Sequence, residues 1–152
     1  MLDIYIDGDA CPVKEEVLKV AGRHGLQVLF VSNRWSRKVD APNVRQVVVT
    51  EGFDAADNWI ADNIGAGDIA ITADIPLASR CLKAGAHVLG PTGRPFTEHS
   101  IGMALAMRDL NAHLRETGEI KGYNASFASK DRSRFLGELE RLIQQVRKEQ
   151  NP

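Results

Sequence analysis

Two aspartates close the first apolar run of the chain. Residues 2–6 are mostly apolar, and Asp7-Gly8-Asp9 follows them directly. A carboxylate at the end of a buried strand is costly unless a partner such as a cation offsets its charge. Carboxylate oxygens are the ligands that Mg²⁺ and Mn²⁺ prefer. We therefore expect Asp7 and Asp9 to serve a metal-dependent reaction.

A second group of acids lies in the middle of the chain. Between Arg45 and Arg80 there is no Lys or Arg, whereas the acids there are Glu51, Asp54, Asp57, Asp62, Asp68 and Asp74. Carboxylates brought together repel unless a cation or protons offset them. Ordinary structural roles compete with a site, because Asp54 and Asp57 suit the first turn of a helix and Asp74 suits a helix cap.

Alternating apolar runs and helical patterns organise the first ninety residues. The expected strands are residues 2–6, 26–31, 44–49, 68–73 and 87–89, and the expected helices are residues 12–24, 55–64 and 76–84. Continuous apolar runs are typical of parallel strands buried on both faces. The alternation predicts an α/β three-layer sandwich, with a mostly parallel, Rossmann-like five-stranded sheet between helices.

The last third of the chain has a different character. Residues 91–152 predict a helical extension, with helices at about 98–116 and 131–148, on the core formed by residues 1–90. The chain length suits one domain spanning 1–152. The apolar faces of the two helices suit either the sheet or a second subunit, so a homo-oligomer is an open alternative.

In an open parallel sheet, ligands bind beyond the carboxyl ends of the strands. Asp7, Ser32, Asn33 and Asp74 follow strands at that predicted edge. We expect Ser32 or Asn33 to orient a phosphate or a metal-bound water.

Two basic segments are candidates for phosphate contacts. Residues 32–38 hold three cations and Trp35, and Arg pairs with phosphate while Trp stacks on bases. The alternative is a solvated loop in which Trp35 covers the edge of the core. Arg94, Lys130, Arg132 and Arg134 form the second group, in the irregular C-terminal part of the chain. Folded over the acids, they would clamp phosphates; the alternative is that they are solvated.

Composition narrows the class of protein. Nineteen Lys plus Arg against twenty Asp plus Glu give a net charge of −1, so any nucleic-acid site must be local. The two cysteines, Cys11 and Cys81, have no zinc-binding spacing.

No signal peptide and no apolar run of about 20 residues is present, which predicts a cytoplasmic protein without a membrane partner. The sequence has neither a nucleophile elbow nor a Walker pattern.

Four segments resemble the bacterial YaiI/YqxD family: IYIDGDACPV at 4–13, TADIPLA at 72–78, GPTGRPF at 90–96 and DRSRF at 131–135. The resemblance covers nearly the whole chain. It favours a role for Arg132 and Arg134, and it implies no particular reaction.

Residues 1–90 also resemble a PIN-type nuclease domain. The resemblance implies functional acids at the end of the first strand, at the start of the helix before the fourth strand and after that strand. These positions are Asp7, Asp57 and Asp74. PIN domains carry a further acid on a middle helix, for which residues 32–50 are too short. Either Asp9 takes its place or the metal site is incomplete.

The leading hypothesis is a metal-dependent phosphodiesterase acting on RNA or single-stranded nucleic acid. Asp7, Asp9, Asp57 and Asp74 would hold Mg²⁺ or Mn²⁺ and form the catalytic site. One alternative is a haloacid-dehalogenase-like phosphatase, which Asp7-Gly8-Asp9 favours and the absence of Lys between residues 39 and 82 disfavours. The other is a non-catalytic nucleic-acid- or nucleotide-binding module with a degenerate acidic site.

Overall fold

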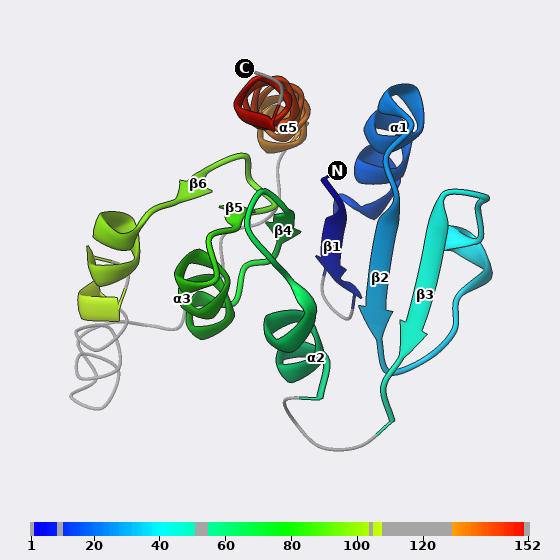
Figure 1. The fold of residues 1–152 in the computed structure, drawn as a ribbon, viewed down its shortest axis with the longest axis horizontal. Helices are drawn as coiled ribbons and strands as arrows, with labels where there is room; N and C mark the ends of the chain where they lie inside the picture. The colour runs from blue at the N-terminus through cyan, green and yellow to red at the C-terminus, as the bar shows by residue number, and fades with distance from the viewer. Residues whose placement is uncertain (1, 9–10, 51–54, 104, 108–128, 151–152) are drawn as a thin grey trace.

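A computed structural model describes residues 2–8, 11–50, 55–103, 105–107 and 129–150 (Figure 1). The strands are β1 (Ile4–Asp7), β2 (Val28–Ser32), β3 (Val44–Val48), β4 (Ile69–Ile71), β5 (His87–Leu89) and β6 (Pro95–Phe96). The helices include α1 (Lys14–His24), the 3₁₀ helix η2 (Arg37–Val39), α2 (Ala55–Asn63), α3 (Ile75–Lys83) and α5 (Ser129–Gln150).

The sheet has the order β3-β2-β1-β4-β5-β6. The first five strands in that order are parallel, as predicted, and β6 adds an antiparallel edge strand that the sequence did not predict. β6 is only two residues long and begins with a proline, so it carries no alternating pattern. The predicted five-stranded sheet is thus one strand short.

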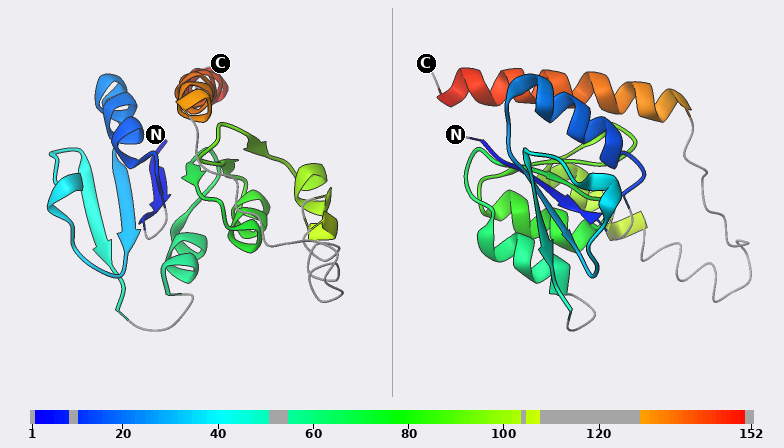
Figure 2. Two further views of the ribbon diagram at one scale, coloured as in Figure 1. Left: turned by 180° about the vertical axis from the view of Figure 1, so that it is seen from behind. Right: turned by 90° about the vertical axis from the view of Figure 1, so that its right-hand side faces the viewer.

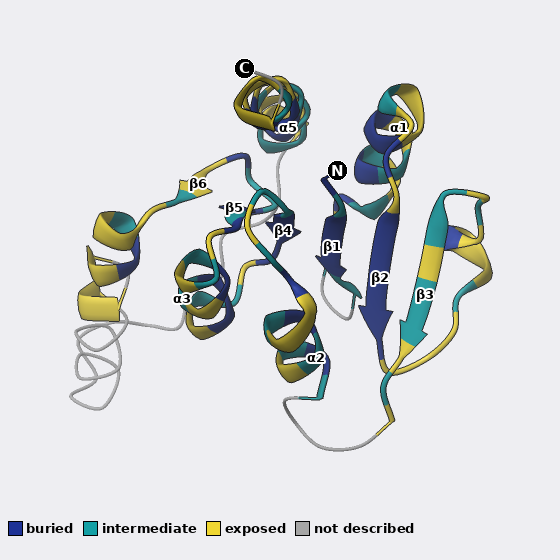
Figure 3. Cartoon of the chain, in the orientation of Figure 1, coloured by how far each residue is buried: buried dark blue, intermediate teal, exposed yellow. Residues whose placement is uncertain are grey.

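Helices cover both faces of this sheet (Figure 2). One core joins β1, β2 and β4 to α1 and α5, and the other joins the opposite face to α2 and α3. The central strands β1 and β2 are nearly free of solvent (Figure 3). This burial on both faces explains why their sequences are continuous apolar runs. The three-layer α/β sandwich is confirmed.

The helix α1 begins after a turn at Pro12 and Val13, two residues later than predicted. Glu15 and Glu16 lie in its first turn, where negative charge interacts favourably with the helix dipole. Gly25 ends the helix with φ of 66°, and its N–H donates to the carbonyls of Ala21 and Gly22. The helix α1 is the next helix after β1 along the chain, so its N-terminal end lies at the carboxyl edge of the sheet.

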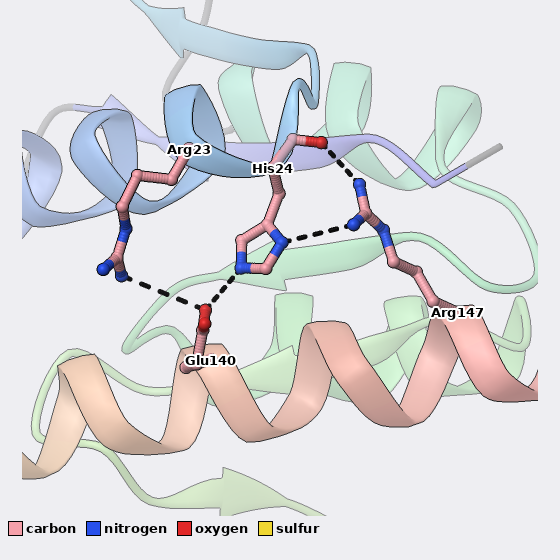
Figure 4. Close-up of polar contacts among 4 residues, drawn as sticks. All are labelled: Arg23, His24, Glu140 and Arg147. Carbon is pink, nitrogen blue, oxygen red and sulfur yellow. Dashed lines mark hydrogen bonds and ion pairs between the residues drawn. The ribbon is translucent and has the colours of Figure 1, made fainter.

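The C-terminal helix α5 is held against α1 by a polar junction (Figure 4). Arg147 Nη1 lies 3.2 Å from His24 Nδ1, and His24 Nε2 lies 2.5 Å from Glu140 Oε2. Because an arginine side chain only donates hydrogen bonds, Nδ1 of His24 is the acceptor. Nε2 of His24 then carries the hydrogen and donates it in the hydrogen bond to Glu140. Apolar residues of α5 complete the core on that face: Phe135, Leu139, Leu142, Ile143 and Val146. The apolar face of α5 thus covers the sheet.

The other predicted C-terminal helix lies partly within the described residues. Residues 98–103 and 105–107 are helical, and Met103, Leu105 and Met107 expose between 40% and 57% of their surface. The remainder of the predicted segment, to residue 116, lies outside the described residues. In the described part of the chain, no helix is both long enough and apolar enough to cross a membrane.

Candidate functional site at the carboxyl edge of the sheet

The chain changes direction in the sheet between β1 and β4. Strands β2 and β3 extend the sheet on one side of β1, and β4 and β5 extend it on the other. Ligands of open α/β sheets bind at this switch point, outside the carboxyl ends of the strands. Asp7 ends β1 at this point, and Thr72 follows β4 beside it. The hydroxyl of Thr72 donates to Asp7 Oδ2 at 3.3 Å.

Thr72 also connects Asp7 to Asp74. Its Oγ1 accepts a hydrogen bond from Asp74 N at 3.0 Å, and the residue is only 4% exposed. Asp74 in turn caps α3, since its Oδ1 accepts from Leu77 N at 2.8 Å. The structural role that the sequence left open for Asp74 is therefore present. A carboxylate has about four acceptor positions, so the cap leaves it able to bind a further group.

A pocket of about 240 Å³ opens between these acids. The residues that line this acidic pocket are Asp7, Cys11, Ile71, Thr72, Ala73, Asp74 and Pro91. Two of them are carboxylates and none is Lys or Arg. Burial raises the pKa of the Cys11 thiol to about 11, and the nearby charge of Asp7 adds to the rise. Cys11 is therefore a neutral thiol at physiological pH and supplies no thiolate nucleophile.

The four-acid metal set is only partly visible. Asp9 lies outside the described residues. Asp57 is half-buried on α2 and does not line the acidic pocket; its charge contributes to the raised pKa of Cys81, after burial. Within the described part of the chain, no three His, Cys, Asp or Glu residues gather as metal ligands. Asp7 and Asp74 are the predicted ligands that the structure brings into one pocket.

A second pocket lies on the other side of β1, toward β2. It measures about 330 Å³, and the residues lining this basic pocket are Gly8, Lys14, Phe30, Ser32, Asn33, Arg34 and Ser36. Ser32 and Asn33 thus lie in a pocket next to the acids rather than among them. The Ser32 hydroxyl donates to the carbonyl of Arg34 at 2.6 Å. In this geometry its proton holds the loop and is not directed at a ligand.

The three arginines that the sequence predicts as phosphate contacts do not line the acidic pocket. Arg132 forms an ion pair with Glu16 of α1, and Arg134 lies 3.7 Å from Asp131 on its own helix. Arg94 is exposed and lines a third pocket, of about 270 Å³, together with Pro91 and Phe96. Ala73 and Pro91 line both this pocket and the acidic pocket, so the two adjoin.

Two residues that line the pockets, Lys14 and Thr72, are not among the site residues that the sequence predicts. Lys14 is the first residue of α1, and a helix that follows the first strand of a parallel sheet must begin at the carboxyl edge. That topological rule was the available signal. Thr72 was visible only as part of a motif, since nothing local shows that its hydroxyl contacts an acid 65 positions away.

Comparison with known proteins places the chain in a family. Residues 5–145 match the family described as "Uncharacterized BCR, YaiI/YqxD family". A UPF0178 protein of Rhizobium etli is 65% identical over 144 residues, covering 95% of this chain and 93% of the relative. A UPF0178 protein of Mesorhizobium japonicum is 62% identical over 149 residues, covering 98% and 96%. No solved structure matches. The chain belongs to the YaiI/YqxD (UPF0178) family.

Proposed function

We propose that this protein is a metal-dependent phosphodiesterase that acts on RNA or single-stranded nucleic acid. One observation carries the proposal: Asp7 and Asp74 line a single pocket at the switch point of a parallel sheet. Carboxylate oxygens gathered in one pocket are the ligands that a hard divalent cation such as Mg²⁺ or Mn²⁺ prefers. The likeness of residues 1–90 to PIN-type nucleases supports the same reading.

The donors in the acidic pocket suit a hard divalent cation. Mg²⁺ is typically bound through one or two carboxylates together with waters and substrate phosphates. Asp7 and Asp74 would provide the carboxylates, and the buried Thr72 hydroxyl would hold Asp7 in a fixed orientation. Mg²⁺ or Mn²⁺, when bound, lowers the pKa of a water and neutralises phosphate charge. Asp9 and Asp57 remain proposed members of the set.

Calorimetric titration with Mn²⁺ tests this proposal. Wild type is compared with Asp7→Asn, while Asp62→Asn serves as a control that removes an exposed carboxylate of α2. We expect Asp7→Asn to lose both Mn²⁺ binding and metal-dependent hydrolysis of a single-stranded RNA, with an unchanged circular dichroism spectrum. Asp62→Asn should retain both. Metal-dependent hydrolysis by a folded Asp7→Asn protein would overturn the proposal.

The same proteins separate the alternatives. A haloacid-dehalogenase-like phosphatase would form a phosphoaspartate at Asp7, which beryllofluoride would mimic as a stable adduct. A binding module would show no hydrolysis in the wild type at any metal concentration. Neither outcome is expected.

A further inference from the structure

The basic pocket contains two cations without an ion-pair partner among the described residues. Lys14 comes from the first turn of α1 and Arg34 from the loop after β2. Neither takes part in any ion pair or side-chain hydrogen bond found within the described ranges. Like charges in one concave site repel until an anion enters it. We propose that this pocket binds a phosphate group of a single-stranded nucleic acid, beside the acidic pocket.

The loop that carries Arg34 is held at both ends. At one end, Ser32 donates to the Arg34 carbonyl at 2.6 Å. At the other, Gln46 of β3 accepts from Ser36 N and donates to Ser36 O, both at 2.8 Å. A loop fixed in this way loses little further freedom when it binds a ligand. Ser32 and Gln46 are therefore positioning residues, and Lys14 and Arg34 make the contacts.

Trp35 indicates that the phosphate belongs to a nucleic acid rather than to a free anion. It directly follows Arg34, and 56% of its surface is exposed. An exposed indole beside a phosphate-binding cation is the combination that single-strand binding proteins use, since every base presents a face that stacks. The alternative that the sequence left open, in which Trp35 covers the edge of the core, is wrong because more than half of the Trp35 surface is exposed.

The positions of the two pockets suit a single-stranded nucleic acid that passes over the end of β1. The acidic pocket lies on the β4 side of β1 and the basic pocket on the β2 side. Asp7 lines one pocket and its neighbour Gly8 lines the other, so one single-stranded nucleic acid crossing the end of β1 would reach both pockets. The ligand class, nucleic acid, rests on the proposed function, whereas the charge of the pocket does not.

Fluorescence anisotropy with a labelled hexauridylate, in EDTA and over a series of salt concentrations, tests the pocket without any catalysis. Lys14→Gln and Arg34→Gln should each weaken binding about three- to tenfold. Each should also reduce the slope of log affinity against log salt by about 0.7, and the double variant by about 1.4. Arg34→Lys should keep the slope. Lys19→Gln removes an exposed lysine of the same helix that does not line the pocket, so it should behave as wild type.

If the double variant had the same slope of log affinity against log salt as Lys19→Gln, the proposal that this pocket binds phosphate would be overturned. Trp35→Ala should weaken hexauridylate binding about tenfold while leaving the salt slope unchanged. Displacement of the oligonucleotide by equimolar inorganic phosphate, with no effect of Trp35→Ala, would overturn the nucleic-acid assignment. Because EDTA removes any metal, this binding measurement does not depend on the metal site, whose failure the calorimetric Mn²⁺ titration measures separately.

Discussion

Gly8 lies directly against the aromatic ring of Phe30. A Cβ atom added at Gly8 would be 2.6 Å from both Cε1 and Cζ of that ring. Phe30 belongs to β2 and is 2% exposed, so the ring has little room to retreat. Gly8 therefore packs closely onto the sheet. This contact fixes the position of Gly8, which lines the basic pocket, directly beside Asp7, which lines the acidic pocket.

Substitution Gly8→Ala should lower the free energy of unfolding by about 1–3 kcal/mol, because the added methyl overpacks the Phe30 contact. It should also weaken Mn²⁺ binding, since the backbone at Gly8 must shift and Asp7 is its direct neighbour in the chain. Urea unfolding and calorimetry measure the two effects. The matched control is Gly22→Ala in α1, where nothing lies within 4 Å of the added Cβ. That substitution should stabilise the protein by about 0.5–1 kcal/mol. Equal stabilities of Gly8→Ala and wild type would contradict the contact.

Asp74 has two roles that substitution can separate. Asn keeps an oxygen that accepts from Leu77 N, whereas Ala removes the helix cap. Asp74→Ala should therefore lose about 1 kcal/mol of stability and Asp74→Asn much less. Both remove the negative charge, so both should weaken Mn²⁺ binding. Wild-type metal affinity in Asp74→Asn, measured by calorimetry, would leave Asp74 as a cap alone.

The two cysteines predict how stability depends on alkaline pH. Burial raises the pKa of Cys11 and of Cys81 from 9.0 to about 11. Between these values the folded protein binds protons more tightly than the unfolded chain, so the free energy of unfolding falls as pH rises from 9 to 11. The full stability is present below pH 9, where both states hold their thiol protons.

Cys11→Ala and Cys81→Ala should each flatten this decline, by as much as about 1 kcal/mol per pH unit. Burial also raises the pKa of Tyr5, but its contribution is the same in every variant. Urea unfolding at several pH values measures the slopes. Curves parallel to wild type above pH 9 would show that the thiols do not titrate as described.

The sequence predicts the sheet because its signal is local. Runs such as Val28–Ser32 are apolar because they are buried on both faces, so their composition alone marks them as strands. The same topology placed Asp7 and Asp74 at one edge, and the structure confirms that both line one pocket.

Contacts between distant residues are not visible in this way. The ion pair of Arg132 with Glu16 joins residues 116 positions apart, and either residue alone looks like solvated surface charge. The expected role of Arg132 in phosphate binding comes from the family resemblance and stays a prediction, whereas its ion pair with Glu16, which links α5 to α1, could not be predicted from the sequence. Topology alone places Lys14 at the carboxyl edge of the sheet, but that it shares a pocket with Arg34 is visible only in three dimensions.

Arg147 should contribute more to stability than any exposed arginine of α5. It donates to the His24 carbonyl at 2.5 Å, near the end of α1 where carbonyls lack helical partners, and it contacts the His24 ring. The His24 side chain is only 12% exposed, so removing the arginine leaves buried polar atoms unsatisfied. Arg147→Ala should lower the free energy of unfolding by about 1–3 kcal/mol. Arg141→Ala, whose partners are on its own helix, should change it by less than about 0.5 kcal/mol. Equal effects in urea unfolding would mean that the junction in Figure 4 does not hold α5 in place.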